Sequence, residues 1–238
     1  MTSSAKLLAL LGALGLPLSG CGDWGVDGNG DRVDEAREVA AFTRVRSDCD
    51  LDVQVAQGDT QSLTVSIDSN LQELVQTRVD GDTLYLDLTD DVGDVVHGPH
   101  VLITVPELTA AKLAGSGTLT VAFDEPELPL DLYLSGSGEL SFKGTTAAVG
   151  AFLSGTGDLR LEGETSDVEM KLSGSGSIRG KNLTASSAAI MLSGSGSVSA
   201  NVQDSVTVAL SGSGQVDLFG DATLDSYRDT GSGELVRH

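Results

Sequence analysis

The sequence predicts an all-β protein that winds as a parallel β-solenoid with coils of about 19 residues. Two observations lead to this fold class. A Gly-Ser-Gly motif recurs from residue 113 onward at intervals of 18 to 21 residues, and leucines and valines alternate with polar residues on both sides of each copy. A period of two is the pattern of strands with one buried face. Because one coil cannot bury its own apolar face, the coils must stack.

The motif defines the C-terminal part of the chain, residues 113–238. The first glycines of its seven copies are Gly115, Gly136, Gly155, Gly174, Gly194, Gly212 and Gly231. Glycine adopts positive φ and lets neighbouring backbones approach, so each copy is expected to form a corner between two strands. The serine or threonine between the glycines is expected to satisfy polar groups along the stack. In the last copy Asp229 replaces the leucine, which predicts a polar terminal coil that caps the stack.

Residues 41–112 lack the motif but keep strand alternation. Strands are expected near residues 50–55, 63–67, 83–88 and 101–105, with a short helix within residues 69–78. Glycine- and aspartate-containing turns separate them. We interpret this segment as the less regular first half of one β-solenoid domain that spans residues 41–238.

Residues 1–20 have the form of a secretory signal, with one cation at Lys6 and an apolar stretch from Leu7 to about Leu18. The tetrapeptide that ends at Cys21 resembles the bacterial lipoprotein box, which implies lipidation of Cys21 and cleavage before it. We therefore expect a lipid-anchored protein of the bacterial cell envelope. Gly22 after the cysteine favours the outer membrane, on its periplasmic or surface face. The alternative is an ordinary signal peptide or a membrane anchor with an unrelated cysteine.

Residues 21–40 are rich in glycine and aspartate, and they predict a flexible acidic tether between the lipid and the domain. Within them, oxygen-bearing side chains occupy five positions of a calcium-binding loop. These residues are Asp27, Asn29, Asp31, Glu35 and Glu38. Arg32 stands where such a loop requires glycine, so a solvated tether is the alternative. His97 and His100 form a second metal-like pair within a turn. No cofactor is expected.

The chain has 35 acidic and 14 basic side chains and a net charge of −21. This balance argues against binding nucleic acid or an anionic lipid surface, which require a basic footprint. After lipidation of Cys21, Cys49 is the only free thiol and no internal disulfide can form. Cys49 shares a strand face with Leu51 and Val53, so we expect a buried structural thiol.

One row of residues carries the candidate binding site. The residue before each repeat leucine points away from the core, so Tyr133, Phe152, Lys171 and Met191 are expected to stack along the outside of neighbouring coils. Adjacent aromatic rings beside a cation suit a strip that stacks on a sugar or a peptide. The alternative is that these residues reflect strand propensity alone or lie under loops.

Several segments together resemble the bacterial head GIN domain family, described as a putative auto-transporter adhesin. They are Phe42 to Val45, Asp52 to Asp59, Leu71 to Val75 and the Leu-Ser-Gly-Ser-Gly series, and the resemblance covers roughly residues 40–236. It implies a right-handed parallel β-helix and brings no catalytic residues with it.

The sequence thus predicts a cell-envelope lipoprotein that is not an enzyme and displays a β-solenoid for surface binding, adhesion or scaffolding. Its expected partners are the membrane, through the lipid, and a surface glycan or protein. One alternative is a polysaccharide-active β-helix enzyme, which needs clustered carboxylates, or basic residues with calcium, in a cleft on one face. The basic residues are scattered along the sequence, and only Arg160, Arg179 and Lys171 are expected to approach one another across coils. The other alternative is the sensory ectodomain of an envelope signalling system.

Overall fold

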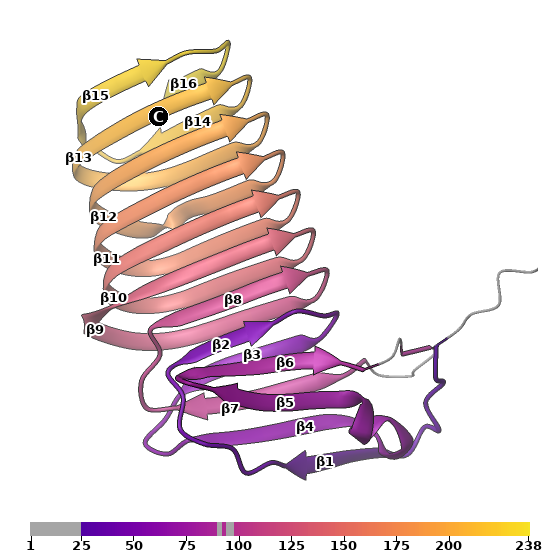
Figure 1. The fold of residues 1–238 in the computed structure, drawn as a ribbon. Coiled ribbons are helices and arrows are strands. Elements are labelled where there is room, and N and C mark those ends of the chain that lie inside the picture. The colour runs from indigo at the N-terminus through magenta and orange to yellow at the C-terminus, as the bar shows by residue number, and fades with distance from the viewer. Residues whose placement is uncertain (1–24, 90–91, 94–97) are drawn as a thin grey trace, which may run out of the picture.

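The computed structural model describes residues 25–89, 92–93 and 98–238, and Cys21, the signal segment and His97 lie outside these residues. The chain winds into a β-solenoid of about seven turns with coils of about 19 residues, as predicted (Figure 1). The less regular strands form one end of the stack and the C-terminus lies at the other (Figure 1). Among the described residues, no helix is both long and apolar enough to cross a membrane.

The repeat coils are long strands that run from one glycine motif to the next. They are β9 (Thr118–Gly136), β10 (Glu139–Gly155), β11 (Asp158–Gly174), β12 (Ser177–Gly194) and β13 (Ser197–Gly212), followed by β14 (Gln215–Phe219), β15 (Thr223–Asp229) and β16 (Glu234–Arg237). Each coil pairs in parallel with the next, and equivalent residues lie opposite each other, for example Leu134 with Leu153 and Leu153 with Leu172. The repeat interval in the sequence is therefore the length of one coil.

The glycine corners are closed by the backbone. The carbonyl oxygen of Gly136 accepts hydrogen bonds from the amides of Thr156 and Gly157, both at 3.0 Å, and the same pattern recurs along the stack. Gly155 has φ of +135°, and a Cβ there would clash with the Gly136 carbonyl. The corner serine and threonine hydroxyls, which were expected to satisfy polar groups along the stack, do not bond to these backbone groups. Among the described corner hydroxyls, only those of Ser213 and Ser232 bond to each other, at 3.1 Å.

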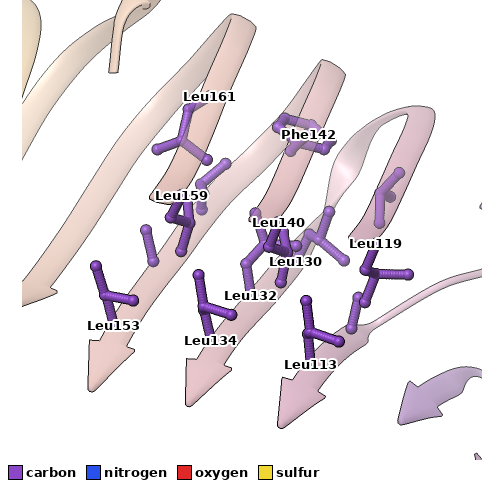
Figure 2. Packing of buried hydrophobic residues seen from close by; sticks show 14 of the residues in the cluster. Leu113, Leu119, Leu130, Leu132, Leu134, Leu140, Phe142, Leu153, Leu159 and Leu161 are labelled. Atoms are coloured by element: carbon purple, nitrogen blue, oxygen red, sulfur yellow. The ribbon is translucent and has the colours of Figure 1, made fainter. Parts of the chain in front are cut away.

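Stacked leucines fill the space between the two walls of the solenoid (Figure 2). The labelled rows in this view include Leu113, Leu134 and Leu153 on the strand segments before the motif, and Leu119, Leu140 and Leu159 on those after it (Figure 2). These six side chains are at most 2% exposed. We call the segments after each motif the first layer and those before it the second layer.

The N-terminal half continues both layers with separate short elements. They are β1 (Arg32–Ala36), β2 (Arg44–Ser47), β3 (Asp52–Gln57), β4 (Ser62–Asp68), the 3-10 helix η1 (Ser69–Leu74), β5 (Val75–Asp80), β6 (Thr83–Leu88), β7 (His100–Val105) and β8 (Ala110–Gly115). The first layer runs β1-β4-β7-β3-β9, and the second runs β5-β6-β2-β8-β9. The helix expected within residues 69–78 stops at Leu74, because residues 75–80 pair with β6 as a strand.

The prediction of a flexible tether over residues 21–40 is wrong for the part that forms β1. This strand pairs antiparallel with β4, and all five of its side chains are exposed, so no alternation of apolar and polar residues predicts it. The Arg37 guanidinium then donates to the backbone carbonyls of Gln72 and Val75. Since β4 would otherwise present a free edge, β1 completes the sheet at this end.

The calcium-loop candidates do not gather into a metal site. Asn29 and Gly30 bond through their amides to Asn70 and Asp68, each at 3.0 Å, which fixes this segment against the start of η1. Residues 32–36 are extended, so Glu35 belongs to a strand rather than to a loop. Over the described ranges, no group of three or more His, Cys, Asp or Glu side chains is placed to hold a metal ion.

Candidate functional site

The structure places the four predicted strip residues side by side on the outside of the second layer. Backbone register sets Tyr133 opposite Phe152, Phe152 opposite Lys171, and Lys171 opposite Met191. Toward the N-terminal end, the same register continues this line through residues of β8, β2, β6 and β5. Toward the C-terminal end, the register adds Ala209 opposite Met191 and Arg228 opposite Ala209. We call the whole line the outer row, which comprises Arg78, Tyr85, Arg46, Lys112, Tyr133, Phe152, Lys171, Met191, Ala209 and Arg228.

The residues before the repeat leucines include Lys112, but three further members of the outer row, Arg78, Tyr85 and Arg46, were not predicted from the sequence. In the repeat coils, neighbours in space are about 19 residues apart, so a fixed interval finds them. In the N-terminal half, Arg46 of β2 lies between Tyr85 of β6 and Lys112 of β8. No constant spacing predicts that order. The only available signal was the basic and aromatic character of the outward positions in each strand.

The aromatic members of the outer row stack on one another. The Tyr133 and Phe152 ring centroids are 4.9 Å apart with an interplanar angle of 15°, and the Lys171 ammonium lies 5.3 Å from the Phe152 centroid. These contacts cover ring faces, and both rings are half-buried. The predicted mode, in which sugars stack on open ring faces, is therefore not available between Tyr133 and Phe152.

Two neighbouring groups fix this pair in place. The Tyr133 hydroxyl donates to Asp131 Oδ2 at 3.2 Å. Burial, followed by the Asp131 carboxylate, raises the pKa of Tyr133, while the nearby Arg44 acts in the opposite direction. Gly150 leaves room for the Phe152 ring, because a Cβ on Gly150 would lie 2.7 Å from Phe152 Cε2. The ring position therefore depends on the absence of a side chain at residue 150.

A hollow of about 320 Å³ opens at the N-terminal end of the aromatic pair. We call it the cation hollow, and its charged and aromatic lining residues are Arg44, Arg46, Lys112, Tyr85 and Tyr133. Arg46 pairs with Asp48 at 2.7 Å and lies 5.7 Å from the Tyr85 centroid. The side chains of Arg44 and Lys112 form no hydrogen bond or ion pair with any residue that the structure describes.

A shallow groove of about 450 Å³ lies beside the outer row on the same layer. We call it the acidic groove. The polar side chains that line it are Asp131, Asp167, Glu169, Ser187, Ser205 and Thr207. Glu169 pairs with Lys171 at 2.6 Å, and the Ser187 hydroxyl donates to Asp167. Asp131 belongs to this groove and also bonds to Tyr133, so the groove and the cation hollow meet at that hydrogen bond.

The first layer has a different outer surface. Arg160 and Arg179 lie opposite each other there and pair with Glu139 and Asp158 respectively. Lys171 lies on the second layer, so the expected approach of these three basic residues is wrong. The first layer also carries a second ring stack, between Phe219 and His238, with centroids 4.3 Å apart.

The remaining predicted candidates have structural surroundings. Cys49 is free and half-buried, and it packs against the core at the corner between β2 and β3. Burial raises the pKa of its thiol to about 11, so the nucleophilic thiolate is scarce at neutral pH. His100 contacts Asp52 through Nδ1 at 3.0 Å and belongs to no metal-binding group of described residues.

Comparison with known families agrees with this architecture. The model of the family described as "Putative auto-transporter adhesin, head GIN domain" matches residues 41–222. The chain belongs to this family. No curated protein sequence matches the chain significantly.

Three solved bacterial structures share the fold of this head GIN domain protein. A "putative adhesin" from Bacteroides fragilis is 20% identical, with a TM-score of 0.79 over 90% of this chain and 100% of that one. A "putative lipid binding protein" from Parabacteroides distasonis is 19% identical, with a TM-score of 0.70 over 90% and 99%. A "putative adhesin" from Parabacteroides merdae is 17% identical, with a TM-score of 0.68 over 89% and 99%. At these identities the likeness establishes the fold.

Proposed function

We propose that this head GIN domain protein is a non-catalytic lipoprotein of the bacterial cell envelope that binds surface ligands through the outer row. The observation that carries the proposal is the outer row itself. It brings aromatic and basic side chains from eight strands into one line, although the net charge of the chain is −21. Tryptophan, tyrosine and arginine are enriched among the residues that contribute most to binding at protein interfaces, and the outer row contains two tyrosines and three arginines.

Membership of an adhesin family and the adhesin descriptions of two structural neighbours support a role in adhesion. The lipoprotein-like box at Cys21 supports attachment to the membrane, since two or three acyl chains hold a protein stably. A solenoid that rises from such an anchor presents its long side to the surroundings.

The acidic residues of the second layer do not favour catalysis. A glycosidase needs one carboxyl group to give up a proton and another to act as a base or nucleophile. Here Asp131 accepts from Tyr133, Asp167 accepts from Ser187, and Glu169 pairs with Lys171. The arginines of the first layer are likewise paired with acids. These groups therefore favour a binding surface over a hydrolase.

The decisive experiment compares two aromatic variants in an adhesion assay. Loss of Tyr133 and Phe152 (Tyr133→Ala with Phe152→Ala) is expected to weaken capture of the protein by host or bacterial surfaces about tenfold. Phe219→Ala removes a stacked ring from the first layer and serves as the matched control. Equal loss in both variants, or none in either, would contradict binding through the outer row. Release of reducing sugar from captured polysaccharide would contradict the absence of catalysis.

The anchor is tested separately from the binding surface. Wild-type protein made in cells fed radiolabelled palmitate is expected to carry the label and to sediment with membranes. Cys21→Ser is expected to lose both properties, while Cys49→Ser keeps them. Label that persists in the Cys21→Ser protein would exclude lipidation at this residue.

A further inference from the structure

We propose that the cation hollow binds the carboxylate of an acidic glycan, and that hydroxyl groups of the neighbouring sugars lie in the acidic groove. This inference rests on the proposed function, because it names the ligand class for the same outer surface. It depends on three features of the second layer: two cations that pair with none of the described acidic residues, an adjoining surface of acceptors, and the size of the two depressions.

The first feature selects an anionic group. Arg44 and Lys112 line one hollow and have no acidic partner among the described residues, in a chain where acidic side chains outnumber basic ones by 35 to 14. An arginine fork and a lysine ammonium together suit a carboxylate, and charge-assisted hydrogen bonds of this kind are the strong ones.

The second feature selects a ligand with few charges and many hydroxyls. Immediately beyond Tyr133, the acidic groove presents the carboxylates of Asp131, Asp167 and Glu169. Carboxylates accept hydrogen bonds from sugar hydroxyls, and they repel a second anionic group. An acidic peptide or a nucleic acid has its charges too closely spaced for this surface. A glycan in which carboxylated and neutral sugars alternate fits the change of sign from hollow to groove.

The third feature is size. The cation hollow is about 320 Å³ and the acidic groove about 450 Å³, and both volumes fall within the range of small-molecule sites, roughly 300–1,000 Å³. The two depressions meet at the hydrogen bond between Tyr133 and Asp131. One oligosaccharide can therefore occupy both depressions.

The experiment uses an array of oligosaccharides printed in pairs, each uronate-containing glycan beside the same glycan with its carboxyl groups reduced to alcohols. Neutral glycans and polyglutamate are printed as further probes. Wild-type protein is expected to bind uronate-containing members and to lose about tenfold to hundredfold in affinity for their reduced forms. Higher salt is expected to weaken the binding, because the hollow is open to solvent.

Two double variants locate the site. Arg44→Ser with Lys112→Ser is expected to bind uronate-containing glycans as weakly as wild type binds the reduced forms. Lys143→Ser with Lys181→Ser removes the same charge from residues that have no ion pair with a described residue and lie outside the hollow, and it is expected to bind like wild type. Circular dichroism and thermal melting establish that both variants are folded.

The results that would overturn this inference differ from those that would overturn the proposed function. Equal affinity for carboxylated and reduced glycans, equal loss in the two double variants, binding of polyglutamate alone, or no bound uronate-containing glycan would each exclude a carboxylate site in the hollow. A neutral glycan or a protein captured through Tyr133 and Phe152 would leave the proposed function standing. Unchanged capture by surfaces after loss of those two rings would remove the proposed function instead.

Discussion

The repeat coils and the N-terminal half build the same two layers in different ways. From β9 to β13, chain order is spatial order and every pair is parallel. In the N-terminal half, β2 inserts between β6 and β8, and three pairs are antiparallel: β1 with β4, β4 with β7, and β5 with β6. The difference shows that one core can be continued by a periodic winding or by an irregular set of strands.

The two regions also differ in what holds their connections together. At the repeat corners, backbone amides and carbonyls of adjacent coils bond to each other directly. At the N-terminal end, side chains satisfy the backbone instead: Arg37 donates to the carbonyls of Gln72 and Val75, and the Gln72 amide donates to the carbonyls of Val33 and Val65. Stability should therefore depend on glycines in one region and on long polar side chains in the other.

The largest expected effect comes from comparing a glycine in each region. Gly163, in β11, has φ of +121°, and a Cβ there would overlap the Gly144 carbonyl; Gly81, in the turn between β5 and β6, has φ of +64° and nothing within 4 Å of a Cβ. Gly163→Ala is expected to lower the free energy of unfolding by about 3 kcal/mol or more, and Gly81→Ala by about 1 kcal/mol. Denaturant titration measures both, and equal losses would contradict the distinction.

A smaller effect is expected from the N-terminal cap. The Arg37 side chain is only 14% exposed, and Arg37→Met leaves the carbonyls of Gln72 and Val75 without their donor. The free energy of unfolding should fall by about 1–3 kcal/mol. Arg78→Met is the control, since that side chain is 63% exposed, its pair with Asp80 spans 3.5 Å and its guanidinium lies 4.5 Å from the Tyr85 ring centroid. Its cost should stay below about 1 kcal/mol. Hydrogen exchange should show faster exchange in β1 and β5 of the Arg37→Met protein, with the amides of β11 unchanged.

The smallest effect concerns the junction between the two regions, where Cys49 lies. Cys49 is half-buried and packs against the core close to Gly115 of the first motif, so the reactivity of its thiol reports whether this junction stays closed. Because burial raises its pKa to about 11, alkylation by iodoacetamide should be slow at pH 8 and accelerate as pH rises toward 11. In urea-unfolded protein the acceleration should come near pH 9. The Cys21→Ser background keeps Cys49 as the only thiol, and identical profiles would show that the junction is open.

The repeat was the part of the molecule most accessible to sequence analysis. A constant interval predicted the coils, the buried leucines and the placement of Tyr133 beside Phe152, because neighbours in space were one interval apart. The strand β1 was missed since its side chains are all exposed. Residues 75–78 were included in the predicted helix, whereas pairing with β6 makes them a strand, and local sequence does not encode that pairing. The cation hollow depends on strand order in the N-terminal half, which local periodicity does not encode.

The corner hydrogen bonds have an evolutionary consequence. In each motif between the first and the last, the first glycine carbonyl accepts hydrogen bonds from the next coil, and the two amides that follow it donate to the previous coil. Duplication of one unit of about 19 residues would therefore lengthen the protein by about 4.8 Å, the spacing of paired strands, and leave its two ends unaltered. Relatives of different length can arise by gain or loss of whole units, each of which adds or removes one residue in the line of outward side chains.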